Sequence, residues 1–220
     1  IDSLPIKGSN IFSNAHVTSS GDSVKLTFNK KSPSSLWGYT VEYNGNDTIL
    51  YFKKPPQLSS DSSQPLKGIT VALDAGHGGN DSGAAGTAGY SGPTEKDLTL
   101  AAVKATQKRL ESLGATVVVP RTDDSTMTMD ARIQQAEAKK VDFFISMHYN
   151  SIATGANATN AKGVEVYYYQ DMSTDFGQHM LASLSTGTGR NARGVKFSTF
   201  RGTLNTYAPS LLLELGFLCN

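Results

Sequence analysis

Four side chains carry most of the chemistry that this sequence could perform. His77 stands in a glycine-rich stretch ("DAGHGGNDSG"), and His148 lies near the end of an apolar run ("FFISMHYN"). Glu214 interrupts another apolar run ("LLLEL"), where an unpaired charge is costly to bury. Glu95 lies in the first turn of a predicted helix, on the side that faces the sheet. Each residue alone has an ordinary interpretation, as part of a hydrogen-bonded structure, an ion pair or a helix terminus.

Taken together, these residues match the ligand set of a catalytic zinc ion. Two imidazoles and one carboxylate fill three positions and leave a fourth for water. The remaining carboxylate would then be the general acid or base of a hydrolysis. Cys219 is the only cysteine, which excludes an intramolecular disulfide and a cysteine-based zinc site. We expect Gly76, Gly78 and Gly79 to let the backbone pass close to the metal and the substrate, where a Cβ would collide.

The elements that must position these residues alternate between strands and helices. Near-continuous apolar strands that alternate with helices are typical of an α/β fold with a largely parallel sheet. In such folds ligands gather at the carboxyl ends of strands, which is where His77 and His148 lie. We predict strands over residues 68–75, 115–121, 141–150, 163–170 and 210–217, and helices over residues 95–113, 128–140 and 173–186.

A different organisation is predicted for the first part of the chain. Short stretches alternate between apolar and polar residues, and Asn44–Gly45 is a hairpin signal between two of them. A Pro- and Ser-rich stretch that follows is typical of a linker. We therefore predict a small β-rich module over residues 1–54, with strands over 23–29, 38–44 and 48–54, a linker over 55–67 and a catalytic domain over 68–220.

The composition argues against several kinds of partner. The 220 residues include 20 Lys and Arg against 19 Asp and Glu, which gives a net charge of +1. No basic run with interleaved aromatic residues is present, so we expect no nucleic-acid binding. No apolar run reaches the roughly 18–20 residues of a membrane span. We expect a monomer that does not cross a membrane.

Five motifs in the second part of the chain resemble the zinc-dependent N-acetylmuramoyl-L-alanine amidases of bacterial cell walls. These motifs, which extend from about Gly68 to Asn220, are "VALDAGHGGNDSGAAG", "EKDLTL", "VPRTDD", "ISMHYNS" and "LLLELGFLCN". The resemblance implies one zinc ion bound by His77, Glu95 and His148, with Glu214 as the catalytic residue. It also implies a twisted, mostly parallel sheet with helices on both faces.

The resemblance further implies hydrolysis of the amide between N-acetylmuramic acid and L-alanine in peptidoglycan. Such lytic enzymes are secreted or associated with the wall, outside the cytoplasmic membrane. Members of the family usually continue past "ELGF" with a closing helix, whereas this sequence ends at Asn220. Some division amidases carry a long insert that blocks the zinc. The residues at 151–162 ("SIATGANATNAK") are rich in Gly, Asn and Ala, so we expect a loop there that leaves the site open.

Two arginines are further candidates for the site. Arg121 ends a predicted strand and Arg132 lies on a predicted helix, and either could bind a stem-peptide carboxylate through two hydrogen bonds. Ordinary salt bridges are the alternative for both. Two other functions also remain open: a wall-binding protein without turnover, and a zinc exopeptidase that acts on soluble peptides. The presence of Glu214 argues against the first of these.

Overall fold

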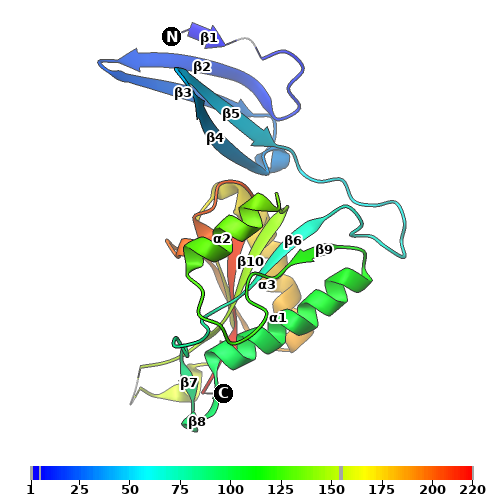
Figure 1. Cartoon of the computed structure of the whole chain (residues 1–220), viewed down its shortest axis with the longest axis vertical. Coiled ribbons are helices and arrows are strands. Elements are labelled where there is room, and N and C mark those ends of the chain that lie inside the picture. Colours follow the sequence, from blue (N-terminus) through cyan, green and yellow to red (C-terminus); the bar gives the residue numbers. More distant parts are fainter. Residues whose placement is uncertain (1, 5, 154–155, 220) are drawn as a thin grey trace. The chain divides into compact units, whose positions relative to one another are not determined.

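Antiparallel strands form where apolar and polar residues alternate in the first part of the chain. The computed structural model describes residues 2–4, 6–153 and 156–219, and the chain divides into two compact units, Ile1–Pro55 and Pro56–Asn220. The first unit holds a three-stranded antiparallel sheet, a 3-10 turn and a separate hairpin, so the predicted β-rich module is confirmed (Figure 1). Its elements are β1 (Asp2–Leu4), β2 (Phe12–Ser20), β3 (Ser23–Lys30), η1 (Pro33–Ser35), β4 (Gly38–Asn44) and β5 (Asp47–Lys53).

Three phenylalanines form the centre of this first unit. Phe12 lies with its ring centroid 5.1 Å from that of Phe28 and 4.7 Å from that of Phe52. These rings join the three-stranded sheet to the hairpin. In the hairpin, Asn44 pairs with Asp47, and Gly45 adopts a φ of 59° in the tight turn between them.

A six-stranded sheet forms the second unit. The strand order is β12-β11-β13-β10-β6-β9, and β11 with β13 is the antiparallel pair in an otherwise parallel sheet. The predicted mostly parallel sheet is therefore confirmed. The strands are β6 (Thr70–Ala75), β9 (Thr116–Val118), β10 (Phe143–Asn150), β11 (Val164–Tyr168), β12 (Ala192–Phe197) and β13 (Ser210–Phe217).

Helices cover both faces of this sheet, as predicted (Figure 1). Val103 of α1 and Leu181 of α3 join the apolar cluster on one face, whereas Ile133 and Ala136 of α2 join the cluster on the other. A short ribbon leads into α1. The bounds are α1 (Glu95–Ser112), α2 (Met129–Ala138) and α3 (Thr174–Thr188), with the ribbon strands β7 (Ala85–Gly86) and β8 (Gly89–Thr94) and the 3-10 turns η2 (Ala158–Asn160), η3 (Asp171–Ser173) and η4 (Arg201–Thr203).

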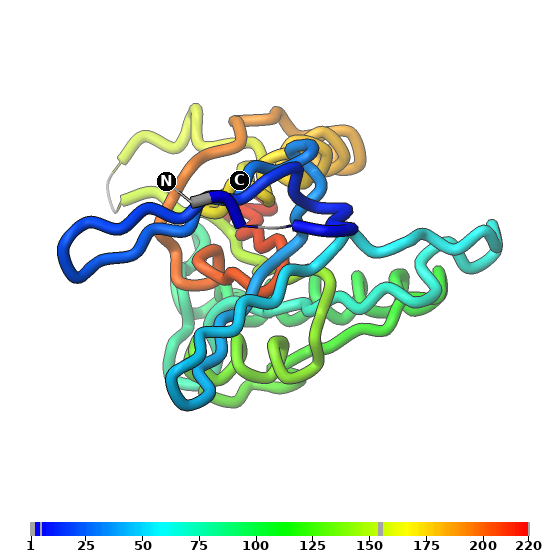
Figure 2. Tube along the Cα trace, turned by 90° about the horizontal axis from the view of Figure 1, so that it is seen from above, coloured from blue at the N-terminus to red at the C-terminus, as the bar shows by residue number. Residues whose placement is uncertain are grey.

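The stretch predicted as a linker belongs largely to the second unit, which begins at Pro56. Its Leu66 packs against the core, and the Leu66 N–H donates to the carbonyl of Leu113 over 3.0 Å. Figure 2 shows this stretch in cyan beside the end of α1 in green. A fragment made to study the second unit should therefore begin at Pro56.

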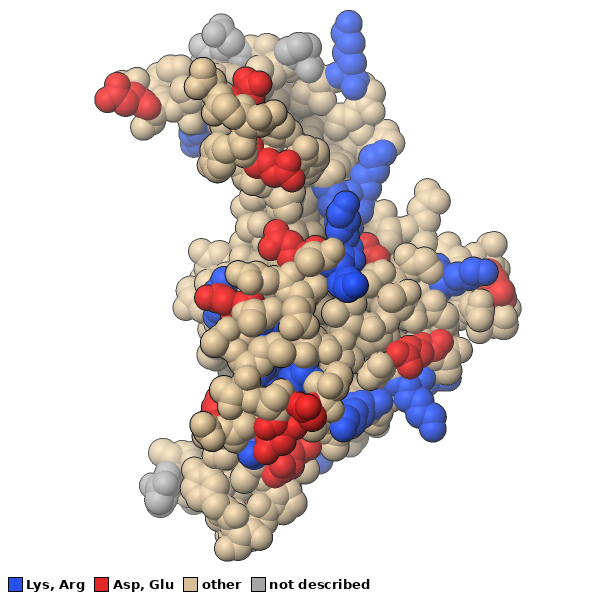
Figure 3. All heavy atoms as spheres, in the orientation of Figure 1, with Lys and Arg blue, Asp and Glu red and all other residues tan. Residues whose placement is uncertain are grey.

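The surface carries charges of both signs, as the nearly equal numbers of basic and acidic residues predict. Acidic and basic side chains are interspersed on the face seen in Figure 3. Within the described ranges, no helix is both long enough and apolar enough to cross a membrane.

The loop over residues 151–162 contains only the short turn η2 in its described part, and residues 154–155 lie outside the described residues. The expectation of a loop there is confirmed for the part that is described.

Candidate active site

The loop after β6 brings His77 to the carboxyl edge of the sheet. His77 has a φ of 63°, in the left-handed region that non-glycine residues rarely adopt. Such strain is typical of functional sites. A Cβ on Gly76 would lie 2.6 Å from Nδ1 of His148, so only glycine permits this close approach. Gly83 was not among the glycines predicted to allow a close approach, but it is equally confined. A Cβ added at Gly83 would lie 2.7 Å from Oε2 of Glu95.

His77, Glu95 and His148 converge at this edge. Nε2 of His77 lies 3.0 Å from Oε2 of Glu95, and Nδ1 of His148 lies 2.9 Å from Oε1 of the same carboxylate. One ligand atom from each residue lies within 4.8 Å of the other two. The three residues thus form a candidate metal site whose donors are two imidazole nitrogens and a carboxylate oxygen.

The start of α1 fixes the position of Glu95. The carboxylate of Asp97 accepts hydrogen bonds from the backbone N–H and the hydroxyl of Thr94, at 2.9 and 2.8 Å, so the helix begins directly at Glu95. The Glu95 side chain points inward and the residue is 5 % exposed. It also accepts hydrogen bonds from the backbone N–H groups of Ala84 and Tyr149, at 3.0 and 3.1 Å.

These contacts keep Glu95 in its charged form. Burial alone would raise its pKa, but the hydrogen bonds from His148, His77 and the Ala84 N–H outweigh burial and hold the pKa well below its usual range. The pKa of His77 is shifted in the opposite direction. Burial would lower it, but the neighbouring Glu95 and Asp81 carboxylates raise it. A buried carboxylate held between two imidazoles is well suited to a cation.

Asp81 orients His77 from the side away from Glu95. Its Oδ2 lies 2.9 Å from Nδ1 of His77, and its Oδ1 accepts a hydrogen bond from the Gly83 N–H over 3.1 Å. An imidazole that donates Nδ1–H to a carboxylate presents the lone pair of Nε2 to a metal. The sequence analysis missed this residue. An aspartate in a glycine-rich loop is usually a turn residue, and its position four residues after His77 was the available signal.

Replacement of Asp81 by Ala is expected to weaken metal binding without removing a ligand. Loss of such an outer partner typically costs about 10–100-fold in metal affinity. The measurement is a competition titration of zinc against a chelator of known affinity. Asp123→Ala is the matched control, because Asp123 is exposed and its carboxylate bonds only within its own turn, to Ser125. Equal affinity in Asp81→Ala and the wild-type protein would refute the orienting role.

Glu214 lies beside this site on β13. It pairs in register with His148 on one neighbouring strand and with Glu165 on the other. Among the described residues, Oε2 of Glu214 is the buried side-chain polar atom that lacks a hydrogen-bond partner. Burial, followed by the negative charges of Glu95 and Glu165, raises the pKa of Glu214 to about 8. An unpartnered carboxyl group at a strand end is available to exchange a proton with a substrate or water.

Comparison with known proteins identifies the family. A family profile described as N-acetylmuramoyl-L-alanine amidase matches residues 71–220. The chain belongs to this family. The match begins in β6 and includes His77, Glu95, His148 and Glu214.

Individual relatives agree with this assignment. The Bacillus subtilis protein YqiI is 36% identical over 169 residues, which are 73% of this chain and 76% of that protein. The probable cell wall amidase LytH of Staphylococcus aureus is 33% identical over 162 residues, 74% of this chain, and the match spans about half (52%) of LytH. The catalytic domain of CwlV, an N-acetylmuramoyl-L-alanine amidase from Bacillus (Paenibacillus) polymyxa, superposes with a TM-score of 0.63 at 33% identity, over 69% of this chain and 82% of that domain.

The two candidate arginines of this amidase-family chain are buried beneath the loop that carries His77. Arg121 is fully buried and donates to the carbonyls of Ala75 and Gly76, at 3.2 and 3.0 Å. It also donates to the Lys96 and Asp123 carbonyls, at 3.2 and 2.8 Å. The guanidinium of Arg121 is thus bound to four backbone carbonyls inside the protein. Gly78 serves the same packing, because a Cβ there would lie 2.6 Å from Cδ of Arg121.

Arg132 has a similar environment on the other side of the loop. It pairs with the buried carboxylate of Asp74 over 2.8 Å and donates to the carbonyls of Ala75 and His77. The Ser146 hydroxyl donates to the second oxygen of Asp74 over 2.6 Å. The donors of both arginines are bound to backbone carbonyls inside the protein, and these contacts hold the loop that carries His77. Binding of a stem-peptide carboxylate by either arginine stays a prediction.

Replacement of Arg132 by Met is expected to destabilise the amidase unit strongly. It leaves the Asp74 charge buried without its cation, which typically costs about 3–5 kcal/mol in the free energy of unfolding. Denaturant unfolding of the two proteins measures the difference. Arg201→Met is the matched control, because its ion pair with Asp130 is exposed on both sides and such pairs contribute about 0–1 kcal/mol. Equal losses in the two variants would contradict the structural role of Arg132.

Proposed function

We propose that this chain hydrolyses the amide between N-acetylmuramic acid and L-alanine in peptidoglycan, with one zinc ion bound by His77, Glu95 and His148. The convergence of these three side chains beside an unpartnered Glu214 carries the proposal. Membership of the amidase family supplies the substrate class.

The donor set fits zinc. Zinc accepts imidazole nitrogen and carboxylate oxygen and, in catalytic sites, takes three protein ligands with one open position. Asp81 supplies the outer carboxylate that such histidine ligands commonly have. When bound, zinc would act as a Lewis acid toward the amide carbonyl.

In this proposal Glu214 transfers the proton of the reaction. Its carboxylate accepts a proton from the attacking water and returns it to the leaving nitrogen of L-alanine, so the amine departs uncharged. Burial raises the pKa of Glu214, and a carboxyl group with a raised pKa can hold the accepted proton until the leaving nitrogen takes it. The strand pairing with β10 and β11 holds Glu214 at the edge where His148 lies.

The proposed place of action is the cell wall, outside the cytoplasmic membrane. LytH, named a probable cell wall amidase, supports this location by similarity. We propose that residues 68–220 act as the catalytic domain, that residues 1–54 form a separate module joined by residues 55–67, and that the protein works as a monomer. The clustering of the chain into Ile1–Pro55 and Pro56–Asn220 supports a separate first module, with the division at the start of the proposed linker.

Digestion of purified sacculi tests the proposed function. The soluble products are separated and each new terminus is identified by mass spectrometry. We expect stem peptides that begin with a free L-alanine amine, together with glycan that carries free lactyl carboxylates. Release of single amino acids would instead indicate an exopeptidase, and binding to sacculi without release would indicate a wall-binding protein. Either result would overturn the proposal.

A further inference from the structure

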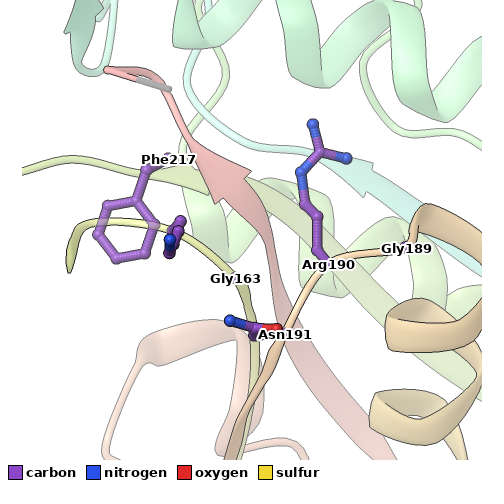
Figure 4. A pocket seen from close by; sticks show the side chains of 6 residues that line it. Gly163, Gly189, Arg190, Asn191 and Phe217 are labelled. Carbon is purple, nitrogen blue, oxygen red and sulfur yellow. The ribbon is translucent and has the colours of Figure 1, made fainter. Parts of the chain in front are cut away.

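A cavity opens on the same edge of the sheet as the candidate metal site. It has a volume of about 280 Å³ and lies between the start of β11, the end of α3 and the end of β13 (Figure 4). Phe217 on its wall follows Glu214 by three residues and pairs with Asn150, two residues after His148. The cavity is lined by Lys162, Gly163, Gly189, Arg190, Asn191 and Phe217.

The cavity is basic, because two of the residues that line it are Lys162 and Arg190. None of the ion pairs between described residues involves Arg190 or Lys162. The nearby Arg193 is different, because it pairs with Glu165 and its guanidinium carbon lies 5.0 Å from the centre of the Phe217 ring. Arg193 thus has a structural role, whereas the side chains of Arg190 and Lys162 are available to bind a ligand.

The backbone makes room for the guanidinium of Arg190. Figure 4 shows its side chain extending beside β13, which carries Glu214. A Cβ on Gly216 would lie 3.3 Å from Nε of Arg190, so glycine at this position lets the side chain lie against the strand. Gly163 and Gly189 add no side chains to the wall, which leaves the space in front of the cations open.

We propose that this cavity binds a free carboxylate of the stem peptide, the α-carboxylate of its glutamyl residue, through Arg190 and Lys162. The inference rests on the proposed function and names a subsite of the same reaction. In peptidoglycan the lactyl carboxylate of N-acetylmuramic acid is consumed in the amide that is cleaved, so free carboxylates lie on the peptide side. Arginine can bind a carboxylate through two parallel hydrogen bonds. The side-chain amide of Asn191 offers a further donor.

Binding of the product peptide tests this subsite without requiring turnover. Two probes are titrated into the full chain at low ionic strength: L-alanyl-γ-D-glutamyl-L-lysine, and the same tripeptide with the glutamyl α-carboxylate amidated. We expect the carboxylate form to bind about 10–100-fold more tightly, the usual value of hydrogen bonds to a charged group. Arg190→Gln and Lys162→Gln should each reduce this preference, and added salt should weaken it.

Arg109→Gln, a change at an exposed position near the end of α1, is the matched control and should keep the preference. Equal affinity of the wild-type chain for the two peptides would overturn the subsite, as would an unchanged preference in Arg190→Gln. Preferential binding of inorganic phosphate over both peptides would also overturn it, in favour of a polymer phosphate. Each of these results is independent of the sacculus digestion, so the subsite and the proposed function can fail separately.

Discussion

Removal of the metal is expected to abolish stem-peptide release, and zinc is expected to restore it. His77, Glu95 and His148 hold their ligand atoms within 4.8 Å of one another, and no other group of three His, Cys, Asp or Glu residues in the described ranges does so. An amide carbonyl is a poor electrophile, and Glu214 alone can move a proton but cannot polarise the carbonyl. The rate of release from sacculi is measured before chelation, after chelation and after one equivalent of zinc is added.

A control separates loss of the metal from loss of the fold. Circular dichroism of the chelated protein should match that of the untreated protein, because the two apolar clusters that hold the sheet to its helices do not include the proposed metal ligands. Release of stem peptides by a folded, metal-free sample would show that the proposed site is not the catalytic one.

Glu214→Gln is expected to retain zinc and to lose most of its turnover. The substitution keeps the size of the side chain but removes its ability to accept a proton, and general acid–base catalysis typically contributes about 10²–10⁴-fold to a rate. The measurement is the rate of stem-peptide release, with the substrate concentration varied so that kcat is resolved from KM.

Glu111→Gln provides the control for this substitution, because Glu111 is an exposed residue whose carboxylate bonds with Gln107 on the outer surface of α1. It should retain the wild-type rate. A wild-type rate in Glu214→Gln would remove this residue from the mechanism and direct attention to Glu165, the buried carboxylate opposite it on β11.

Much of the fold could be predicted because the core elements have strong patterns. The apolar runs of β6, β10 and β13 become the central strands, each close to its predicted bounds. The edges were harder to predict. The strand predicted over 115–121 ends at Val118, and β12 was not predicted. The β12 stretch ("ARGVKF") contains two basic residues and no fully buried residue, so it lacks the apolar continuity that marks a central strand.

Part of the candidate site could likewise be predicted from the sequence, and part could not. His77, Glu95, His148 and Glu214 were predicted because polar residues at strand and helix ends are unusual, and the structure brings all four to one edge. The buried arginines could not be predicted from local pattern. Arginine in a polar stretch is usually a surface residue, and only the tertiary fold reveals that the loop carbonyls need Arg121 as a donor.

The zinc content of three matched samples tests the central assignment most directly. Wild-type protein, Glu214→Gln and Glu95→Gln are each equilibrated with zinc, freed of unbound ion and analysed for metal per chain. We predict about one zinc in the first two proteins, because three protein ligands with one open position describe a catalytic zinc site, and a large loss in Glu95→Gln. Full zinc in Glu95→Gln, or lost zinc in Glu214→Gln, would contradict the assignment of ligand and acid–base residue.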